Sequence, residues 1–333
     1  DSYDIALLSS IAILRPNLEK VLPQYLAYYL KAPRIKQAMK GYVTGAALPR
    51  IILKDFRKFE VQLPNLKVQK KVSSFILAYD KLIQNNTRRI EILEEMAQRI
   101  YKEWFVDFKY PGHENHDLVD SELGMIPEGW EIVQINDLVD IFSGFAFKSN
   151  TFSENGTYGL VTIKNVHDGK FIRKCQNRIE EIPVKMKEFC LLEKGDILLS
   201  LTGNVGRVCL VYGNNYMLNQ RVAKLVSKKE FNIAYIYSKF RNTIFQKELE
   251  IISTGTAQQN LSPILMSKQK FPLASEKIMH EFSKICNPLI KQIISLYEKN
   301  ANLKQTRDYL LPKLISGKVD VSGLDIDTGI LHD

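Results

Sequence analysis

The sequence predicts a mixed α/β protein, in which β-rich domains accompany two long helices that pair as an antiparallel coiled coil. The first observation is a heptad pattern of apolar residues at 72–105, which is typical of a helix that packs on a partner helix. The second is that the same order of motifs returns 210 positions later. The third is a series of short apolar runs between the two helical stretches, each bounded by Gly or Asn, which favours strands.

The two helical stretches carry the strongest pattern. Apolar residues of the first stretch follow two seven-residue series that alternate in steps of four and three, namely Tyr79, Leu93 and Ile100, and Ile83, Ile90, Ala97 and Trp104. About 35 residues at about 1.5 Å each form a rod on the order of 50 Å long, and we expect this length to act as a ruler. Asn86 and Asn300 fall on the seam, where a buried amide fixes the register of paired helices. The alternative is that the two asparagines are exposed and interrupt the apolar seam.

One internal duplication explains the recurrence of the motifs. Three pairs of matching residues are each separated by 210 positions, namely Thr44 and Thr254, Leu63 and Leu273, and Leu93 and Leu303. In the first copy, strands within residues 1–22, one helix over QYLAYYLKAPRIKQAMK after Pro23 and a strand at 59–63 are expected before the long helix. Because the counterpart of Met125 falls before residue 1, we expect the first copy to lack its front half.

Composition fits a globular protein of two or more domains. Of the 333 residues, 45% are hydrophobic and 25% are charged. The formal net charge of +9 comes mostly from residues 1–112, which hold 19 Lys and Arg against 11 Asp and Glu, and this excess permits binding to a polyanion. No apolar run approaches the roughly 18 residues of a membrane span and the first residues do not resemble a signal peptide, so we expect a cytoplasmic protein.

Motifs of catalysis and metal binding are missing from the sequence. The four cysteines form no CxxC pair, and His113 and His116 have no third ligand nearby, so we expect a reducing compartment and no metal site. The Gly-rich turn at 202–207 lacks the Lys-Ser/Thr ending of a nucleotide-binding loop, and a DNA phosphate is the better ligand for it. No motif for S-adenosylmethionine binding or adenine methylation is present. We therefore predict that the chain is not an enzyme by itself.

Four motifs give the chain a specific resemblance. They are NNTRRIEILEEMAQRIYKEWFVDFKYPGHE from Asn85, SELGMIPEGWEI from Ser121, KGDILLS from Lys194 with Thr202-Gly203 after it, and LKQTRDYLLPKLISG from Leu303. In this order and spacing the chain resembles the specificity (S) subunit of type I restriction–modification systems. Two departures are the shortened first recognition domain and Pro288, which interrupts the second helical stretch.

The resemblance implies a DNA-recognition subunit that is not catalytic. Its expected partners are double-stranded DNA, methyltransferase (modification) subunits and motor–nuclease (restriction) subunits. No cofactor is expected in this chain, because S-adenosylmethionine, ATP and magnesium belong to the partner subunits in this family.

The resemblance and the duplication together predict five segments. We expect the C-terminal part of a first target-recognition domain at 1–68, a first spacer helix at 69–112, a complete second target-recognition domain at 113–274, a second spacer helix at 275–317 and a tail at 318–333.

Reading a duplex requires side chains that offer paired donors and acceptors to base edges, with basic and hydroxyl groups on phosphates. The candidates lie in predicted loops, namely Arg50, Lys164, Asn165, Thr202, Asn204, Arg207, Asn219, Gln220, Arg221, Lys224, Gln258, Gln259 and Asn260. We expect base contacts first from residues 219–221 and 258–260. The alternative is that Gly203 and Gly206 merely form a hairpin and that the amides cap turns.

The ends of the two long helices carry more apolar side chains than the contact between two helices would bury. This excess predicts a surface that binds another subunit. Its residues are Tyr101, Trp104, Phe105, Tyr309, Leu310, Leu311 and Leu314. By resemblance the partner is the methyltransferase subunit. The alternative is that these side chains pack onto the neighbouring recognition domain.

Other functions remain open at this point. The chain is alternatively a half-subunit, or a silent or phase-variable fragment, that acts only after dimerisation or recombination. From another class, it is a coiled-coil adaptor without specific DNA binding, which salt-dependent and sequence-selective DNA binding would exclude. Cleavage of DNA by the chain with magnesium alone would indicate a nuclease.

Overall fold

The computed structural model describes residues 11–45, 49–229, 232–255 and 259–329, and the chain falls into two compact units. Unit 1 comprises residues 1–86 and 300–333, and unit 2 comprises residues 87–299. Two long helices, α4 (Leu66–Phe105) and α9 (Glu276–Ile315), contribute residues to both units. The mixed α/β class with two long helices is confirmed.

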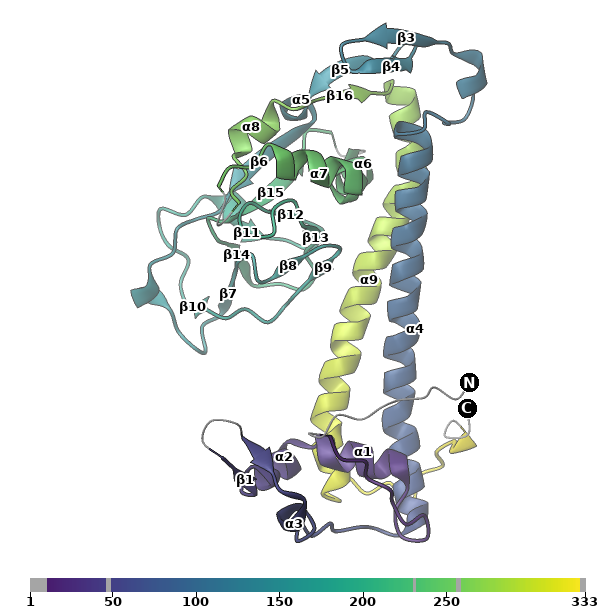
Figure 1. Cartoon of the computed structure of the whole chain (residues 1–333), viewed down its shortest axis with the longest axis vertical. Helices are drawn as coiled ribbons and strands as arrows, with labels where there is room; N and C mark the ends of the chain where they lie inside the picture. Colours follow the sequence, from purple (N-terminus) through teal and green to yellow (C-terminus); the bar gives the residue numbers. More distant parts are fainter. Residues whose placement is uncertain (1–10, 46–48, 230–231, 256–258, 330–333) are drawn as a thin grey trace. The chain divides into compact units, whose positions relative to one another are not determined.

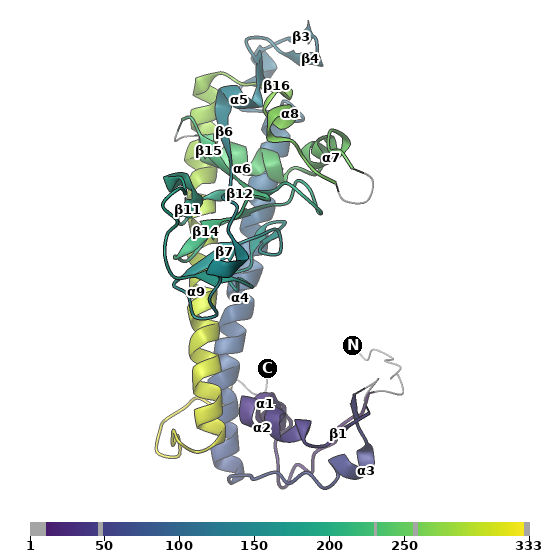
Figure 2. The same ribbon diagram turned by 90° about the vertical axis from the view of Figure 1, so that its left-hand side faces the viewer.

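The two long helices run antiparallel to each other within each unit (Figures 1 and 2). In unit 1 the amide of Asn86 lies 3.0 Å from that of Asn300. In unit 2 the ring of Trp104 lies 5.9 Å from that of Phe282. Since the residue numbers in both pairs add to the same total, a single register joins the helices, and the predicted seam is confirmed.

Both helices are 40 residues long and differ slightly from the predicted ranges. The first was expected to extend to residue 112, but it ends at Phe105, because Phe108 takes a left-handed φ of 57° and the N–H groups after the helix turn back to Lys102 and Glu103. The second continues through Pro288, whose side chain lies on the exposed face. The proline therefore does not break the helix.

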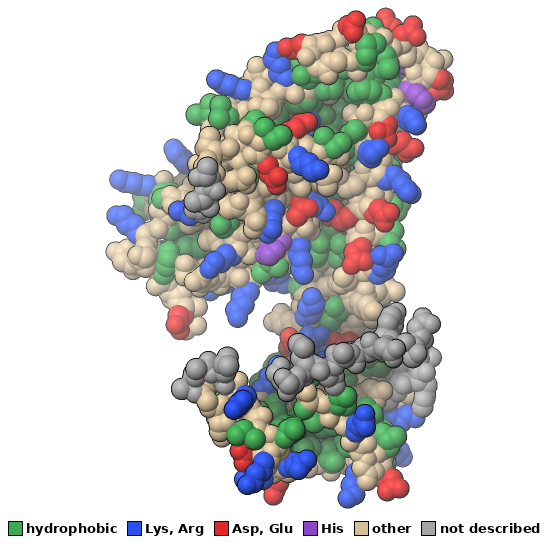
Figure 3. Space-filling model, viewed as in Figure 1, with side chains coloured by type: hydrophobic (Ala, Val, Ile, Leu, Met, Phe, Trp, Pro, Cys, Tyr) green, Lys and Arg blue, Asp and Glu red, His purple; other side chains and the backbone are tan. Residues whose placement is uncertain are grey.

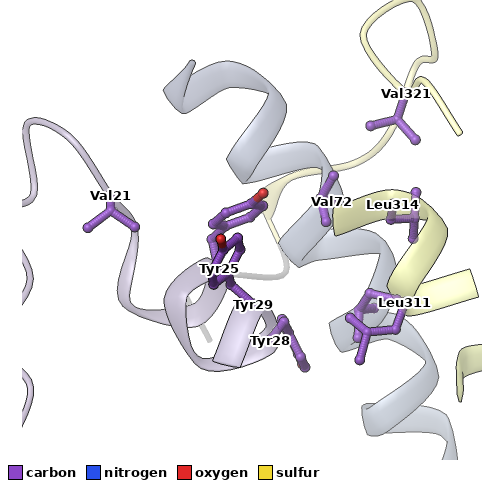
Figure 4. Close-up of a cluster of buried hydrophobic side chains, with 9 residues drawn as sticks. Val21, Tyr25, Tyr28, Tyr29, Val72, Leu311, Leu314 and Val321 are labelled. Carbon is purple, nitrogen blue, oxygen red and sulfur yellow. The ribbon is translucent and has the colours of Figure 1, made fainter. Parts of the chain in front are cut away.

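Unit 1 contains several short elements besides the ends of the long helices. These elements are α1 (Pro23–Lys31), α2 (Pro33–Lys40), β1 (Val43–Thr44), β2 (Arg50–Ile51) and α3 (Leu53–Phe56), with β1 and β2 antiparallel. Figure 4 shows the core of unit 1, in which the tyrosines of α1 point toward α4 and α9. It contains Val21, Tyr25, Tyr28, Tyr29, Val72, Ile76, Leu311, Leu314 and Val321.

Three expectations for unit 1 are corrected. The single helix after Pro23 is two helices, because Pro33 lacks an N–H donor and holds Ala32 in an extended conformation with ψ of 136°. Residues 11–22 form no strand, and residues 1–10 lie outside the described ranges. Residues 59–63 also form no strand.

Unit 2 contains two four-stranded sheets. One has the order β10-β7-β14-β11 and the other β13-β12-β15-β6. The strands are β6 (Val139–Ser143), β7 (Tyr158–Val161), β10 (Arg178–Ile179), β11 (Leu191–Leu192), β12 (Ile197–Ser200), β13 (Val208–Leu210), β14 (Tyr216–Leu218) and β15 (Val222–Ser227). In the first sheet β14 runs parallel to β7, and all other neighbours in the two sheets are antiparallel.

Smaller elements complete unit 2. Three strand pairs lie beside the sheets, formed by β3 (Leu118–Ser121) and β4 (Gly124–Pro127), β8 (Val166–His167) and β9 (Lys170–Phe171), and β5 (Glu131–Gln134) and β16 (Lys270–Leu273). The helices are α5 (Ile135–Leu138), α6 (Ile233–Arg241), α7 (Thr243–Ile251) and α8 (Pro263–Ser267), and one-turn 3-10 helices occur at His113–Asn115, Ser149–Thr151 and Glu188–Cys190.

The internal duplication is visible as repeated elements. Helix α1 recurs as α6 and α4 recurs as α9, with start and end residues 210 apart in both cases. Thr44 pairs with Arg50 in unit 1, and Thr254 pairs with Asn260 in unit 2 at the same offset. One clear difference is that β16 is a strand because it pairs with β5, whereas residues 60–63, its counterpart, have no partner strand among the described residues.

Candidate nucleic-acid interface

Three connecting segments of unit 2 meet at one cleft, which Ser143 at the end of β6 also lines. The main chain joins them, since Leu201 N–H donates to Arg221 O (3.1 Å) and Gly203 N–H donates to Gln259 O (3.1 Å). The cleft has a volume of about 510 Å3. It is lined by Ser143, Leu201, Thr202, Gln220, Arg221, Gln259, Asn260, Leu261, Ser262 and Pro263. Five of the thirteen sequence-predicted DNA-binding residues thus share one surface.

The first segment is the turn between β12 and β13. Gly203 and Gly206 take left-handed φ values of 73° and 80°, which a tight hairpin turn requires. The hydroxyl of Ser200 accepts from Arg207 N–H (3.1 Å) and donates to the carbonyl of Asn204. The two glycines therefore do form a hairpin, and this hairpin places the side chain of Asn204 in solvent.

The second segment is the short connection from β14 to β15. Asn219 N–H donates to Val161 O (3.0 Å) and Gln220 N–H donates to Phe145 O (3.1 Å), which anchors the loop on β7 and on the residues just after β6. A Cβ on Gly144 would lie 2.4 Å from Leu218 O, so only glycine permits this close approach. The side chains of Gln220 and Arg221 remain exposed.

The third segment is the extended stretch before α8. Asn260 exchanges main-chain hydrogen bonds with Thr254 (2.7 and 3.0 Å), and the side chains of Gln259 and Asn260 are exposed. Gln258 lies outside the described residues. Arg50 of unit 1 is the repeat counterpart of Asn260. The likeness extends to a shared contact, because the hydroxyl of Thr44 donates to Arg50 O at 3.4 Å and that of Thr254 to Asn260 O at 3.4 Å.

One residue that lines the cleft has a hydroxyl without a hydrogen-bond partner in the described part of the chain. Within the ranges that the structure describes, Thr202 Oγ1 is buried and has no hydrogen-bond partner. A buried polar atom without a partner costs free energy, so a ligand that supplies one gains affinity. Ser143 and Ser262 also line the cleft and were missed from the sequence, because neither lies beside an amide or a guanidinium group in the chain.

Two candidate residues prove to be structural. Asn165 is 2% exposed, and its amide accepts from Thr162 N–H (3.0 Å) and donates to Ile172 O (2.8 Å). Lys224 pairs with Asp196 at 2.8 Å, and burial raises the pKa of the Asp196 carboxyl. Since both side chains are engaged inside the fold, we remove Asn165 and Lys224 from the candidate set.

Lys164, Arg207 and Asn219 lie outside the cleft lining. Lys164 is exposed and donates to Gln176 Oε1 (3.0 Å), Arg207 is half-buried beside the hairpin, and Asn219 is half-buried. On the face of unit 2 seen in Figure 3, blue Lys and Arg side chains predominate over the part that holds β7 and β10. Acidic side chains are more evident near β3 and β4, and residues 113–131 include six Asp and Glu but no Lys or Arg.

The predicted partner surface is largely buried within the chain. Tyr101, Trp104 and Phe105 are 4–6% exposed and pack on Tyr235 and Phe282, with ring centroids 4.8 Å apart for Phe105 and Tyr235. Packing in this cluster of unit 2 buries the apolar surface of all three side chains. The expected partner surface is wrong for these three residues, because they are buried within unit 2. Tyr101 and Phe105 pack on Tyr235 of α6, in agreement with the alternative of packing onto the recognition domain.

The same correction applies to most of the second helix end. Leu311 and Leu314 are 7% and 5% exposed in the core of unit 1, and Leu310 packs against that core. Tyr309 alone stays in solvent, with 62% of its surface exposed and Lys313 Nζ 3.5 Å from its ring centroid.

A charged network that the sequence did not predict holds the β-rich part of unit 2 on its helices. Arg241 of α6 pairs with Glu94 of α4 (3.6 Å) and with Asp168 of the β8–β9 turn. Tyr237 donates to Glu94 Oε1 (2.6 Å), and Gln246 donates to Asp168 Oδ1 (2.8 Å). Burial raises the pKa of Glu94 even though Arg241 opposes the shift. No local sequence pattern predicts this network, because its members come from three distant segments, namely α4, the β8–β9 turn and residues 237–246.

Neither a metal centre nor a membrane-spanning helix is found in the part of the chain that the structure describes. No three His, Cys, Asp or Glu side chains there are grouped to hold a metal ion. No helix within the described ranges combines the length and the apolar character needed to cross a bilayer. His113 lies in the short 3-10 helix, is partly exposed, and its ring contacts Tyr110 O (2.9 Å).

Comparison with known proteins places the chain in a family. Residues 2–95 and 127–305 match the type I restriction modification DNA specificity domain. The chain belongs to this family, because the match covers most of its length, and the expected family of specificity subunits is confirmed.

Named relatives and a solved structure agree with this placement. The chain is 28% identical over 331 residues to the type I restriction enzyme MjaVIII specificity subunit of Methanocaldococcus jannaschii, covering 96% of this chain and 76% of the relative. It is 22% identical over 381 residues to the type I restriction enzyme HindI specificity subunit of Haemophilus influenzae, covering 96% and 82%. The type I restriction–modification S subunit of M. genitalium shares the fold, with a TM-score of 0.55, 17% identity and coverage of 90% and 74%.

Proposed function

We propose that the chain is the DNA-reading subunit of a type I restriction–modification complex and that the cleft of unit 2 reads bases. The observation that carries the proposal is the convergence of amide, guanidinium and hydroxyl groups from three segments on one open cleft. Arg221 has the donors to pair with O6 and N7 of guanine, and Gln220, Gln259 and Asn260 have the donor and acceptor to pair with adenine. The family membership supports a duplex as the ligand.

Residues around the cleft supply the contacts that position the duplex. Lys164, Asn204 and Arg207 are the proposed phosphate contacts of unit 2, and Asn219 orients the loop that carries Gln220. In unit 1, Arg50 takes the place of Asn260 in the repeat, so we assign it a DNA contact as well. Gln258 remains part of the proposal because it adjoins Gln259 in the sequence.

Catalysis belongs to other subunits in this proposal. The relatives are named specificity subunits of restriction enzymes, which supports assembly with modification and restriction subunits. Those subunits would bring S-adenosylmethionine, ATP and magnesium. Tyr309 is the one residue of the expected partner surface that remains available for contact with the methyltransferase subunit.

Selection from a random duplex library tests the base-reading role. The parent chain is expected to enrich a defined sequence, and the Arg221→Ala variant is expected to lose preference at one base pair by about tenfold, because a bidentate pair contributes roughly 1–3 kcal/mol of discrimination. The measurement is sequencing of the bound fraction at fixed salt concentration.

The matched control is Asn214→Ala, which removes an exposed polar side chain from the β13–β14 connection outside the cleft. It should keep the enriched sequence of the parent chain. An Arg221→Ala variant with unchanged preference would contradict the base-reading cleft. Binding of the parent chain without any sequence preference would favour the adaptor function.

A further inference from the structure

The two long helices are copies of one helix and have similar seams. Ile83 of α4 corresponds to Ile293 of α9, and Leu93 corresponds to Leu303, at the offset of 210. Helices with similar seams are able to pair in more than one way. Besides α4 with α9, the apolar seam alone permits α4 with α4, and α9 with α9, from a second copy of the chain.

A buried amide pair joins the two different helices in unit 1. Asn86 Nδ2 donates to Asn300 Oδ1 (3.0 Å), and Asn300 Nδ2 donates to Ile83 O (3.2 Å). Asn300 is only 5% exposed, so its amide depends on these partners rather than on water.

An ion pair joins the same helices two turns away. Arg307 Nη1 of α9 lies 2.6 Å from Asp80 Oδ1 of α4, and the side chains are 26% and 31% exposed. Tyr28 of α1 donates to the second oxygen of Asp80 (2.8 Å). Each polar pair therefore takes one residue from each helix.

The repeat counterparts of these four polar residues are all apolar. Asn86 and Asn300 correspond to Leu296 and Ile90, and Asp80 and Arg307 correspond to Ile290 and Ala97. The four counterparts are 0–4% exposed within unit 2. At these positions the helix pair is therefore polar in unit 1 and apolar in unit 2.

This asymmetry penalises pairing between identical helices. In an α4–α4 pair with the observed register, Asn86 faces the partner's Ile90 and Asp80 faces the partner's Ala97. In an α9–α9 pair, Asn300 and Arg307 likewise face apolar residues. Both amides and both charges then lose their partner on the other helix, although Asp80 keeps Tyr28 and Arg307 keeps Asp308 of its own helix. Burying an amide without its partner is unfavourable.

We propose that the Asn86–Asn300 and Asp80–Arg307 pairs make α4 selective for α9 and reject a second copy of the chain as its partner. This inference concerns assembly and does not depend on the DNA-reading role. A polar residue at a seam position is known to specify the partner at some expense of stability. Here the duplication produces two similar helices, so polar residues are needed to prevent each helix from pairing with its own copy.

The double variant Asn86→Leu, Asn300→Ile tests the proposal in the full chain, because each position then carries the residue of its repeat counterpart. We expect a thermal unfolding midpoint at or above that of the parent chain. We also expect an increased dimer fraction by light scattering across a concentration series, with tagged and untagged copies recovered together. Each single variant should lower the midpoint by several degrees, because one amide remains without its partner.

The matched control is Asn85→Leu, Asn302→Ile, which places the same residues at exposed neighbouring positions of the same helices. It should keep the molar mass of the parent chain. A seam double variant with the mass profile of the parent chain would overturn the selectivity assigned to the Asn86–Asn300 pair, as would a double variant less stable than both single variants. A charge exchange, Asp80→Arg with Arg307→Asp, should retain the parent mass because the pair is restored between different helices.

Discussion

Residue type alone does not determine whether a polar side chain serves the site or the fold. The side chains of Asn165 and Gln220 both suit base recognition. The amide of Asn165 is hydrogen-bonded to main-chain groups inside the fold, whereas Gln220 is exposed at the cleft. Similarly, Lys224 and Arg221 are three positions apart, and only Lys224 finds a carboxylate inside the fold. The sequence predicts the chemistry of each group, but its tertiary partners decide its role.

The pKa of Lys239 shows how strongly the surrounding fold changes the properties of one side chain. Lys239 is 7% exposed, and its Nζ lies 4.3 and 4.0 Å from the ring centroids of Phe245 and Phe271. Burial lowers the pKa of Lys239 to about 7, although Glu248 opposes the shift. The ordinary pKa of lysine, near 10.5, applies in the unfolded chain.

This pKa difference predicts that stability rises with pH. Between pH 7 and 9 the unfolded chain keeps the Lys239 proton while the folded chain releases it, so raising the pH favours the folded state by up to about 2 kcal/mol. Urea unfolding of the parent and Lys239→Met chains at pH 7 and 9 measures the effect, and the variant should lack this contribution. Lys247→Met removes an exposed lysine of the neighbouring helix and should behave like the parent. Equal pH dependence in the parent and Lys239→Met chains would contradict the assignment.

At the scale of elements, periodic patterns were reliable and isolated strand patterns were not. The heptads and the 210-residue offset predicted α4, α9 and their pairing, because every turn of a helix repeats the signal. Residues 59–63 have a strand-like pattern but no partner strand among the described residues, whereas the equivalent β16 pairs with β5. A strand needs a partner that the local sequence does not reveal.

The close approach at Gly144 gives a prediction for the element that carries Gln220 and Arg221. A Gly144→Ala variant places a Cβ 2.4–2.5 Å from main-chain atoms of Leu218 and Asn219. The connection must move, so we expect a loss of roughly 1–3 kcal/mol in the free energy of unfolding and weaker DNA binding. Urea unfolding and fluorescence anisotropy with duplex DNA measure the two effects.

Gly323→Ala is the control for this substitution. A Cβ at Gly323 meets no atom within 4 Å, and its φ is not in the left-handed region, so both quantities should match the parent chain. Unchanged stability of Gly144→Ala would show that the 219–221 connection does not depend on this glycine.

At the scale of the whole molecule, the sequence predicted the architecture and the loops of the candidate site, but not their convergence. Residues 202, 220–221 and 259–260 form one cleft because Leu201 and Gly203 bind the other two segments through their main chains, which leaves no pattern in side-chain types. The predicted partner surface was wrong because the side chains that form it were visible in the sequence, but the residues that bury them were not. Its aromatic side chains were visible in the sequence, but the unit 2 residues that cover them, Tyr235 and Phe282, are distant in the chain.

The measurement that tests the central claim most directly is a map of methylated adenines in DNA from cells that co-express the chain with a modification subunit. The parent chain and the Asn214→Ala variant should give one common methylation motif. The Arg221→Ala and Asn260→Ala variants should each change or relax that motif at a base pair of the half-site read by unit 2. An unchanged motif in both cleft variants, with the complex intact, would contradict the account.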